Sequence, residues 1–268
     1  HPVTAPSLAG RRILVTRAAT QAGKLSDGLR ALGAIPVEVP VLEIQPPASY
    51  DALDQALKQL ASYHWIILTS TNAVRAVADR AATLGLNLSA FQLPQVAAVG
   101  SATAEEVRKA GLPVALIPEA YVAESLVAAL QSSIAGQRVL LARAAVARDV
   151  IPDALRAAGA IVDVVDAYRN AMPAAAPAQL RAALEKGMDA QGIDAATFTS
   201  SSSVTHLAEA ARAAGLAFPF AAVPAISIGP MTSQTLREHN WPPTAEASPH
   251  DIPGLIAAVV RHLSRMSS

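Results

Sequence analysis

The sequence of 268 residues contains no cysteine. Disulfide bonds, a thiolate nucleophile and Cys-ligated zinc or iron–sulfur clusters are therefore excluded. Aromatic residues are also few, at 4% of the chain, whereas hydrophobic residues make up 52% and are mostly Ala, Leu, Val and Ile. This composition suits helices packed on a buried sheet better than an all-β sandwich.

An excess of charge of either sign is also lacking, because 21 Lys and Arg residues balance 21 Asp and Glu residues. A balanced surface offers no broad electrostatic footprint for a nucleic acid or an anionic membrane. No run approaches the roughly 18 apolar residues of a membrane span, and the opening residues lack the pattern of a signal peptide. We therefore expect no nucleic-acid or membrane partner, and the lack of cysteine fits a cytoplasmic location.

Familiar cofactor and metal motifs are missing as well. No Gly-x-Gly-x-x-Gly follows a predicted strand, and Gly23-Lys24 lacks the upstream glycine of a phosphate loop, so neither NAD nor ATP is expected. The six histidines are scattered, without helical metal spacing or a nucleophile partner. A metal site and a catalytic triad are therefore disfavoured.

The chain does contain an internal repeat whose period is about half its length. Segments of the first half return in the second half in the same order. A repeat of this kind indicates two copies of one structural unit. The matching segments are 12–17 with 138–143, 29–34 with 155–160, 69–74 with 199–204, and 99–103 with 228–232.

Each half predicts alternating strands and helices. Short apolar runs without sustained alternation are typical of parallel strands covered on both faces, and amphipathic stretches that end in glycine lie between them. We therefore predict an α/β fold with two doubly wound parallel-sheet lobes, flavodoxin- or Rossmann-like, with loops and helix N-termini at the carboxyl edge of each sheet. The expected strands are 13–16, 37–39, 65–69 and 96–99, then 139–142, 162–165, 195–199 and 225–228.

Small hydroxyl residues follow equivalent strands in both halves. They stand where the next helix begins, so their side chains either cap the helix or, with free backbone N–H groups, bind an anion. One such segment in each half suggests a ligand with carboxylates or phosphates at both ends, bound in a cleft between the halves. The residues are Ser70, Thr71 and Asn72 in the first half, and Ser200, Ser201 and Ser202 in the second.

Two further equivalent strands are followed by glycine. Glycine permits close approach of the backbone to a ligand, and a hydroxyl residue then opens the next helix. Capping alone would also explain the threonines in these segments. The candidate binding residues here are Gly100, Ser101 and Thr103 in the first half, and Gly229 and Thr232 in the second.

Arginines end the first strand of each half. Arg17 and Arg143 stand where a guanidinium can clamp a carboxylate through two hydrogen bonds. Arg148, in a loop that enters a helix, is a weaker candidate of the same kind. Solvation at the surface is the alternative for these arginines.

Tyr168 follows the second strand of the second half, ahead of Pro173 and an alanine-proline stretch that is typical of a crossing linker. The first half reaches the equivalent place at residues 40–44, ahead of Pro46-Pro47. Two such crossings predict two hinge strands between the lobes. Tyr168 either packs this hinge or presents its phenol as a proton donor.

The ordered set of segments resembles the uroporphyrinogen-III synthase family over nearly the whole chain. The resemblance implies lobes made of residues 1 to about 44 with 173–268, and of residues 45–172. A cut at the repeat boundary near Gly136 would give contiguous domains instead, and the residues alone leave both divisions open. The segments are Val15–Arg17, Thr69–Val74, Ala98–Thr103, Ala167–Arg169, Phe198–Ser201, Ile228–Thr232 and Ser248–Leu255.

The same resemblance implies a lyase that acts on hydroxymethylbilane, a linear tetrapyrrole with acetate and propionate groups. The family's reaction loses water, passes through an azafulvenium cation and a spiro intermediate, inverts ring D, and needs no cofactor. It implies Tyr168 as general acid, with Thr103 and Thr232 at the cleft, and a transient hand-over of substrate from hydroxymethylbilane synthase. Because closure without enzyme gives the type I isomer, the main task is to position ring D.

Two other functions also fit the residues. Duplicated α/β lobes joined by two crossings also describe non-enzymatic, bilobed small-molecule binding proteins, in which Tyr168 would stack on the ligand. A nucleotide-dependent enzyme with an atypical phosphate loop is the third hypothesis, and it predicts stabilisation by NAD or ATP.

Overall fold

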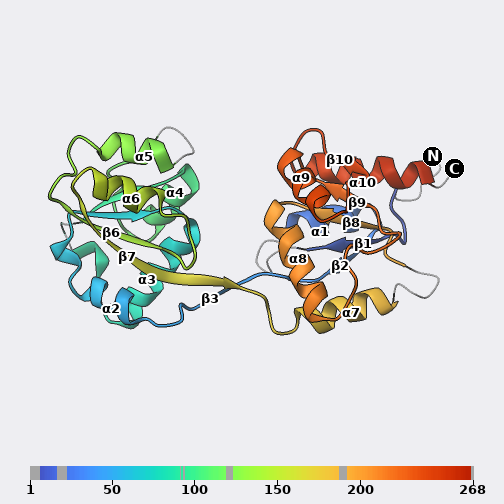
Figure 1. The fold of residues 1–268 in the computed structure, drawn as a ribbon, viewed down its shortest axis with the longest axis horizontal. Helices are drawn as coiled ribbons and strands as arrows, with labels where there is room; N and C mark the ends of the chain where they lie inside the picture. The colour runs from blue at the N-terminus through green and yellow to red at the C-terminus, as the bar shows by residue number, and fades with distance from the viewer. Residues whose placement is uncertain are drawn as a thin grey trace. The chain divides into compact units, whose positions relative to one another are not determined.

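The computed structural model of the chain describes residues 7–16, 23–90, 92, 94–118, 123–186 and 192–266. The chain divides into two compact units, each built around a five-stranded sheet (Figure 1). Unit 1 comprises residues 1–43 and 171–268, and unit 2 comprises residues 44–170. Unit 1 therefore combines the two ends of the chain, whereas unit 2 is contiguous.

The sheet of unit 2 has the strand order β3-β7-β6-β4-β5. The pairs β7–β6, β6–β4 and β4–β5 are parallel, and Trp65 of β4 lies between Val139 and Gln95. The strands are β3 (Glu43–Gln45), β4 (Trp65–Leu68), β5 (Gln95–Ala98), β6 (Arg138–Ala144) and β7 (Ile161–Ala171). The helices are α2 (Asp51–Lys58), α3 (Thr71–Thr83), α4 (Ser101–Lys109), α5 (Ala123–Leu130) and α6 (Val150–Ala157), with short 3-10 turns η1 (Leu60–Ser62) and η2 (Leu88–Ala90).

Both faces of this sheet are covered, because successive side chains of a strand point to opposite faces. In β4, Ile66 and Leu68 pack in one core cluster with apolar residues of α2, α3 and α4. Ile67, between them, packs in another cluster with residues of α5 and α6. This packing explains why the sequence of β4 is a continuous apolar run.

The sheet of unit 1 has the strand order β10-β9-β8-β1-β2, and its strand pairs are parallel. Leu14 of β1 packs with α7 and α8 on one face, and Ile13 and Val15 pack with α1 and α10 on the other. Its strands are β1 (Arg12–Val15), β2 (Ile35–Glu38), β8 (Ala195–Phe198), β9 (Ala225–Ser227) and β10 (Ala245–Glu246). Its helices are α1 (Gly23–Ala31), α7 (Ala176–Lys186), α8 (Ser201–Ala213), α9 (Pro230–Glu238) and α10 (Ile252–Met266).

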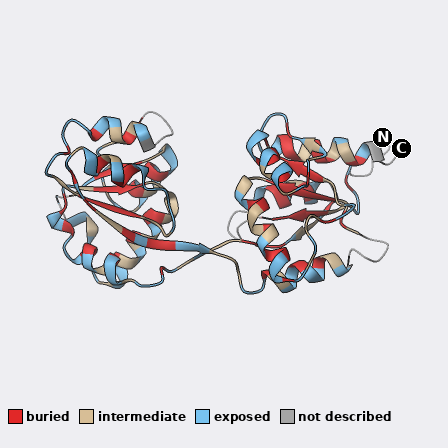
Figure 2. Ribbon diagram, viewed as in Figure 1, coloured by how far each residue is buried: buried red, intermediate tan, exposed pale blue. Residues whose placement is uncertain are grey.

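The two sheets have the same order of repeat-equivalent strands. The repeat relates β1 to β6, β2 to β7, β8 to β4 and β9 to β5, so β2-β1-β8-β9 in unit 1 corresponds to β7-β6-β4-β5 in unit 2. Even the short edge strand β10 has a counterpart, an isolated parallel bridge between Leu116 and Ala97 of β5. The predicted α/β fold with doubly wound parallel sheets is confirmed, and Figure 2 shows the buried strands inside helices with exposed outer faces.

The chain passes between the units within two neighbouring strands. The first passage, after Glu43, lies in β3, and the second, after Asn170, lies in β7. These two strands are neighbours at the edge of the sheet of unit 2. Arg169 of β7 also holds the segment after β3, because its Nε donates a hydrogen bond to the carbonyl of Pro46 at 3.0 Å.

Candidate functional site

The candidate residues of unit 2 lie at the carboxyl edge of its sheet. Ser70 follows β4, Gly100 follows β5, Arg143 lies near the end of β6, and Tyr168 lies near the end of β7. Because these strands are parallel, their carboxyl ends meet at one edge, which is where ligands of open α/β sheets bind. We call this region the unit 2 edge.

Tyr168 reaches the unit 2 edge through a bulge in β7. The register with β6 pairs Arg143 with Asp166 but Ala144 with Tyr168, so Ala167 is an extra residue. Consecutive residues of a regular strand face opposite ways, but Ala167 and Tyr168 both belong to the core cluster under α2, α3 and α4. The bulge therefore directs the phenol ring to this face, where Tyr168 is only 7% exposed.

The phenol oxygen of Tyr168 is hydrogen-bonded to Ser70, with 3.1 Å between Oη and Oγ. Ser70 is the N-cap of α3, and its Oγ also accepts the backbone N–H of Ala73 at 3.1 Å. Either hydroxyl can donate to the other. The structure thus joins two residues that were predicted separately from the sequence, one as a proton donor and one as a binding residue.

A cavity of about 260 Å³ lies beside Tyr168. Its wall includes Tyr50 and Arg80, whose guanidinium lies 3.8 Å from the centre of the Tyr50 ring. Arg80 also binds the carboxylate of Asp54 through Nε and Nη2, at 2.6 and 2.7 Å. These hydrogen bonds lower the pKa of Asp54 below its usual value.

The Arg80–Asp54 pair gives a pH-dependent contribution to stability. Because the folded-state pKa of Asp54 is lowered, this contribution is present above the unfolded pKa of about 4 and is lost as the pH falls through the folded value. We expect Asp54→Asn to lower the melting temperature at neutral pH, with the difference from wild type shrinking below pH 4. Thermal melts from pH 7 to pH 3 measure this.

Asp79→Asn serves as the control for that experiment. Asp79 lines the same cavity, and no ion pair of Asp79 is seen among the described residues. Its replacement should change the melting temperature much less between pH 7 and pH 3. A difference between wild type and Asp54→Asn that stays constant over this range would contradict the role of the ion pair.

In the two hydroxyl-rich segments after β4 and β8, one serine in each unit caps the helix that follows. Ser70 caps α3, and Ser200 caps α8 by accepting the backbone N–H of Ser203 at 3.1 Å. The remaining hydroxyl and amide residues of these segments, Thr71, Asn72, Ser201 and Ser202, lie in the first turns of the two helices and are not N-caps. The capping interpretation is therefore correct for Ser70 and Ser200 and wrong for the other four.

The helices that follow β5 and β9 have glycine N-caps without a side-chain cap bond. Gly100, before α4, has φ +92°, a conformation that other residues rarely adopt, and Gly229, before α9, is extended. The threonines are the third helical residues, and both are buried, Thr103 at 5% and Thr232 at 3% exposure. The two threonines therefore are not the N-caps of these helices.

A glycine N-cap leaves first-turn N–H groups without a side-chain partner. In α4 these donors belong to Ser101, Ala102 and Thr103, and no N-cap side chain bonds them. Donors of this kind are the ones that a helix N-terminus offers to an anion. In α9 the first position is Pro230, which has no N–H, so this helix offers one donor fewer. Among α3, α4, α8 and α9, α4 therefore leaves the most first-turn N–H groups without a side-chain cap or a proline.

The guanidinium of Arg143 binds to residues of the loop that follows β6. Its Nη1 donates to the carbonyl of Arg148 at 2.9 Å, and its Nη2 donates to Asp149. The Arg143 side chain is 14% exposed, whereas Arg148 is exposed. A substrate carboxylate would have to displace Asp149 to reach the guanidinium of Arg143. Arg17, the equivalent candidate in unit 1, lies outside the described residues.

His250 is a residue of the unit 1 sheet edge that was not predicted from the sequence. It follows β10, and its ring packs on Gly229, because a methyl group added at Gly229 would lie 3.5 Å from His250 Cγ. Its Nδ1 is 2.8 Å from the carbonyl of Ala247, which can only accept, so Nδ1 carries a proton. The only signal for it in the sequence is its place in the terminal segment Ser248–Leu255.

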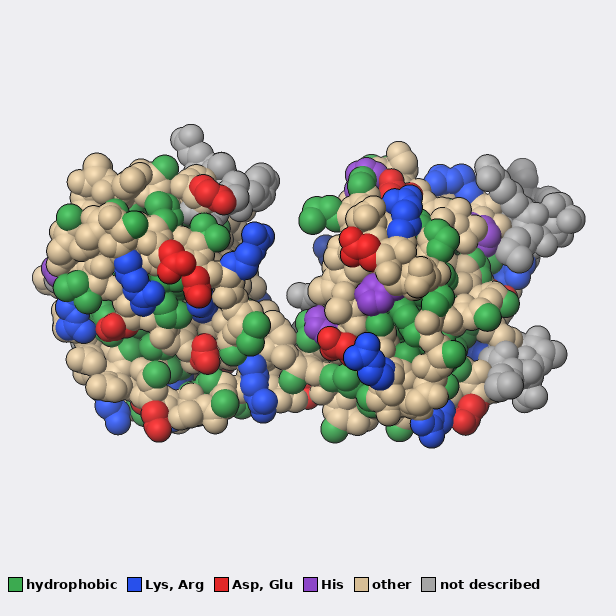
Figure 3. All heavy atoms as spheres, in the orientation of Figure 1, with side chains coloured by type: hydrophobic (Ala, Val, Ile, Leu, Met, Phe, Trp, Pro, Cys, Tyr) green, Lys and Arg blue, Asp and Glu red, His purple; other side chains and the backbone are tan. Residues whose placement is uncertain are grey.

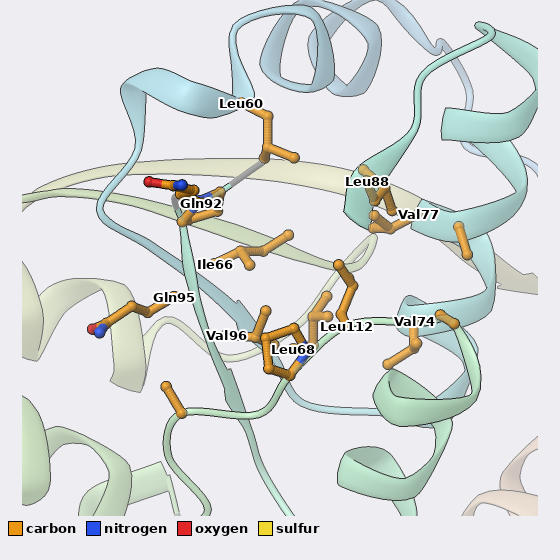
Figure 4. Close-up of a pocket in the computed structure, with 15 residues that line it drawn as sticks. Leu60, Ile66, Leu68, Val74, Val77, Leu88, Gln92, Gln95, Val96 and Leu112 are labelled. Atoms are coloured by element: carbon orange, nitrogen blue, oxygen red, sulfur yellow. The ribbon is translucent and has the colours of Figure 1, made fainter. Parts of the chain in front are cut away.

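Two other cavities, one apolar and one larger, lie away from the candidate residues. An apolar cavity of about 260 Å³ in unit 2 is lined by Leu60, Ile66, Val77 and Leu112, with Gln95 at the start of β5 (Figure 4). A cavity of about 770 Å³ in unit 1 is lined by Arg181, Glu185 and residues just before β8. Both include residues at or just before strand starts and none of the candidate residues, so we place the candidate site at the carboxyl edge, where the polar groups converge.

The described part of the chain has charges of both signs on its surface and few potential metal ligands close together. Lys, Arg, Asp and Glu side chains are interspersed over the face shown in Figure 3, without a broad patch of one sign. Among the described residues, no group of three or more His, Asp or Glu could hold a metal ion. No helix in the described segments is long and apolar enough to cross a membrane.

Comparisons with known proteins agree over nearly the whole chain. The family model described as uroporphyrinogen-III synthase HemD matches residues 23–257. The uroporphyrinogen-III synthase of Synechococcus elongatus is 37% identical over 257 residues, which cover 94% of this chain and 95% of that protein. The porphyrin biosynthesis protein HemD of Ruminiclostridium josui is 30% identical over 87% of this chain, which spans 45% of that longer protein.

The fold also matches a solved structure. The crystal structure of a mutant uroporphyrinogen III synthase from Thermus thermophilus is similar with a TM-score of 0.62 and 21% identity. The match covers 95% of this chain and 99% of that one. At this identity the likeness supports the fold alone.

Proposed function

Because the chain belongs to the uroporphyrinogen-III synthase family, we propose that it is a lyase that converts hydroxymethylbilane to uroporphyrinogen III. The observation that supports an active site in this chain is the position of the Tyr168 phenol. It lies at the carboxyl edge of a parallel sheet and is hydrogen-bonded to Ser70. A phenol there is a proton donor in a region where ligands of this fold bind.

The first step is loss of the terminal hydroxyl of the substrate. Tyr168 donates its proton to this hydroxyl, which leaves as water while the pyrrole nitrogen supplies electrons and an azafulvenium cation forms. The substituted carbon of ring D attacks the cation to give a spiro intermediate. Fragmentation and reclosure invert ring D, and the final loss of a ring-carbon proton restores the phenol. The net change is loss of one water.

Backbone donors supply most of the binding in this proposal. The substrate carries acetate and propionate groups, and the N–H groups at the start of α4, which no side chain caps, suit one carboxylate without a full positive charge. The start of α9 offers a similar terminus in unit 1. Because uncatalysed closure gives the type I isomer, these contacts act by holding ring D for attack at its substituted carbon.

The substrate closes spontaneously, so the proposal includes a transient hand-over from hydroxymethylbilane synthase in the cytoplasm. The support for this hand-over is the lability of the substrate, and the support for the location is the cysteine-free sequence.

The decisive test is the identity of the porphyrin isomer. Hydroxymethylbilane is generated in the assay, the protein is added, and the oxidised products are separated into type I and type III. We expect mostly type III, formed in proportion to the protein added. Type I at the rate seen without protein would overturn the proposed function.

A further inference from the structure

We propose that Ser70 is a positioning residue for Tyr168, whose hydroxyl holds the phenol oxygen and donates a hydrogen bond to the phenolate that proton transfer leaves. The inference rests on the proposed function. It assigns Ser70 a role different from binding the substrate, which was the role expected from the sequence.

The direction of the hydrogen bond follows from the partners of Ser70. Its Oγ accepts the N–H of Ala73, and the same oxygen lies 3.1 Å from Tyr168 Oη. Before proton transfer either hydroxyl can be the donor. After Tyr168 gives its proton to the leaving hydroxyl, the phenolate oxygen can only accept, so Ser70 must donate.

The apolar surroundings of Tyr168 make the hydrogen bond donated by Ser70 important. Tyr168 is 7% exposed and packed among apolar residues, so a phenolate there has little water to stabilise it. Among the described residues that line the adjoining cavity, the one cation is Arg80, and its guanidinium already binds Asp54. The N–H at the start of α3 polarises the Ser70 hydroxyl toward donation, which strengthens its bond to an anion.

Unit 1 contains the same cap without the tyrosine. Ser200 Oγ accepts the N–H of Ser203 at 3.1 Å, as Ser70 does with Ala73, but its second neighbour is Ser202 Oγ. The repeat places Leu42 where the second half has Tyr168. Substitution of Ser200 therefore shows the effect of losing a helix cap alone. Comparison with the same substitution at Ser70 then gives the effect of losing the contact with the phenol.

The test is a double-mutant cycle on kcat for type III formation. We expect Ser70→Ala to lower kcat about tenfold, the lower end of the value of a hydrogen bond to a charged group, with KM changed less than about twofold. With Tyr168→Phe already present, Ser70→Ala should add less than about a twofold further loss. Ser70→Thr keeps the hydroxyl and should restore most of the rate.

Ser200→Ala and Ser70→Gly complete the design. Ser200→Ala removes an equivalent cap, so its effect on kcat should be the same with and without Tyr168→Phe. Ser70→Gly removes the hydroxyl but keeps a residue that tolerates the N-cap position, so it should fold and lose as much activity as Ser70→Ala.

Additive effects of Ser70→Ala and Tyr168→Phe would overturn the inference, and so would full activity of Ser70→Gly. These outcomes are distinct from failure of the proposed function, in which the unsubstituted protein forms no type III isomer. If the unsubstituted protein forms type III but the cycle is additive, the function stands and the role of Ser70 falls.

Discussion

Tyr168→Phe is expected to slow formation of the type III isomer at least about tenfold, the lower part of the range for loss of a general acid. The substitution removes the proton donor but keeps the ring that packs beneath α3. Since uncatalysed closure continues, the fraction of type I should rise as the enzymatic rate falls. Both changes are measured by separating the oxidised porphyrins.

Tyr63 provides a matched control within the same unit. It is also buried, at 2% exposure, and donates a hydrogen bond to Asp163 at 2.6 Å, but it precedes β4 and so lies at the opposite edge of the sheet. Burial and the bond to Asp163 raise the pKa of Tyr63 to about 12, so its phenol keeps its proton at neutral pH.

Tyr63→Phe should destabilise unit 2 by about 1–3 kcal/mol without changing the isomer ratio. Tyr168→Phe should show the opposite pattern, with a loss of about 1 kcal/mol or less in stability and a large loss of rate. Unchanged activity of Tyr168→Phe would remove its assigned role, whatever the stability of the variant.

The second large effect is expected at Gly254, which lies in the first turn of α10. A Cβ added there would collide with the carbonyl oxygen of Pro249, and the N–H of Gly254 donates to Asp251 at 2.7 Å, so backbone would have to move. Leu255 and Val259 of this helix pack in the same cluster as Ile13 of β1. We expect Gly254→Ala to destabilise unit 1 by about 3 kcal/mol, the upper end for overpacking.

Calorimetry or circular dichroism melts check this prediction. Gly23→Ala is the control, because Gly23 begins α1 and a methyl group there meets no atom of the described residues within 4 Å. Alanine favours a helix over glycine, so this variant should melt at or slightly above the wild-type temperature. Equal melting temperatures for Gly254→Ala and Gly23→Ala would show that α10 accommodates the added carbon.

Much of this architecture could be predicted from the sequence because the repeat places equivalent strands in order. A parallel sheet then brings strand ends together, so Ser70, Gly100 and Arg143 could be assigned to one edge from their positions in the chain. The α/β fold follows from the same apolar runs, because strands covered on both faces show no alternation.

Other features depend on geometry that the sequence does not encode locally. The bulge at Ala167 depends on how β7 pairs with β6. The alternation of side chains along a regular strand therefore could not predict which face of the sheet Tyr168 lies on, or its hydrogen bond to Ser70. The partner of Arg143 depends on how the loop to Asp149 folds back. The N-cap positions at Gly100 and Gly229 shift the threonines into the first turns of the helices, a difference within the usual uncertainty of helix boundaries.

The exchange of strands between the two halves also determines the order in which the protein folds during synthesis. β1 and β2 leave the ribosome before the other strands, but their sheet neighbour β8 begins at Ala195, so at typical elongation rates they wait on the order of 10 s for it. Unit 2 needs nothing beyond Asn170 and can fold during this interval. Unit 2 is thus able to form its core before unit 1, and the segment that carries β1 and β2, with the apolar residues of β1 still uncovered, is the part of unit 1 that needs protection from aggregation in the meantime.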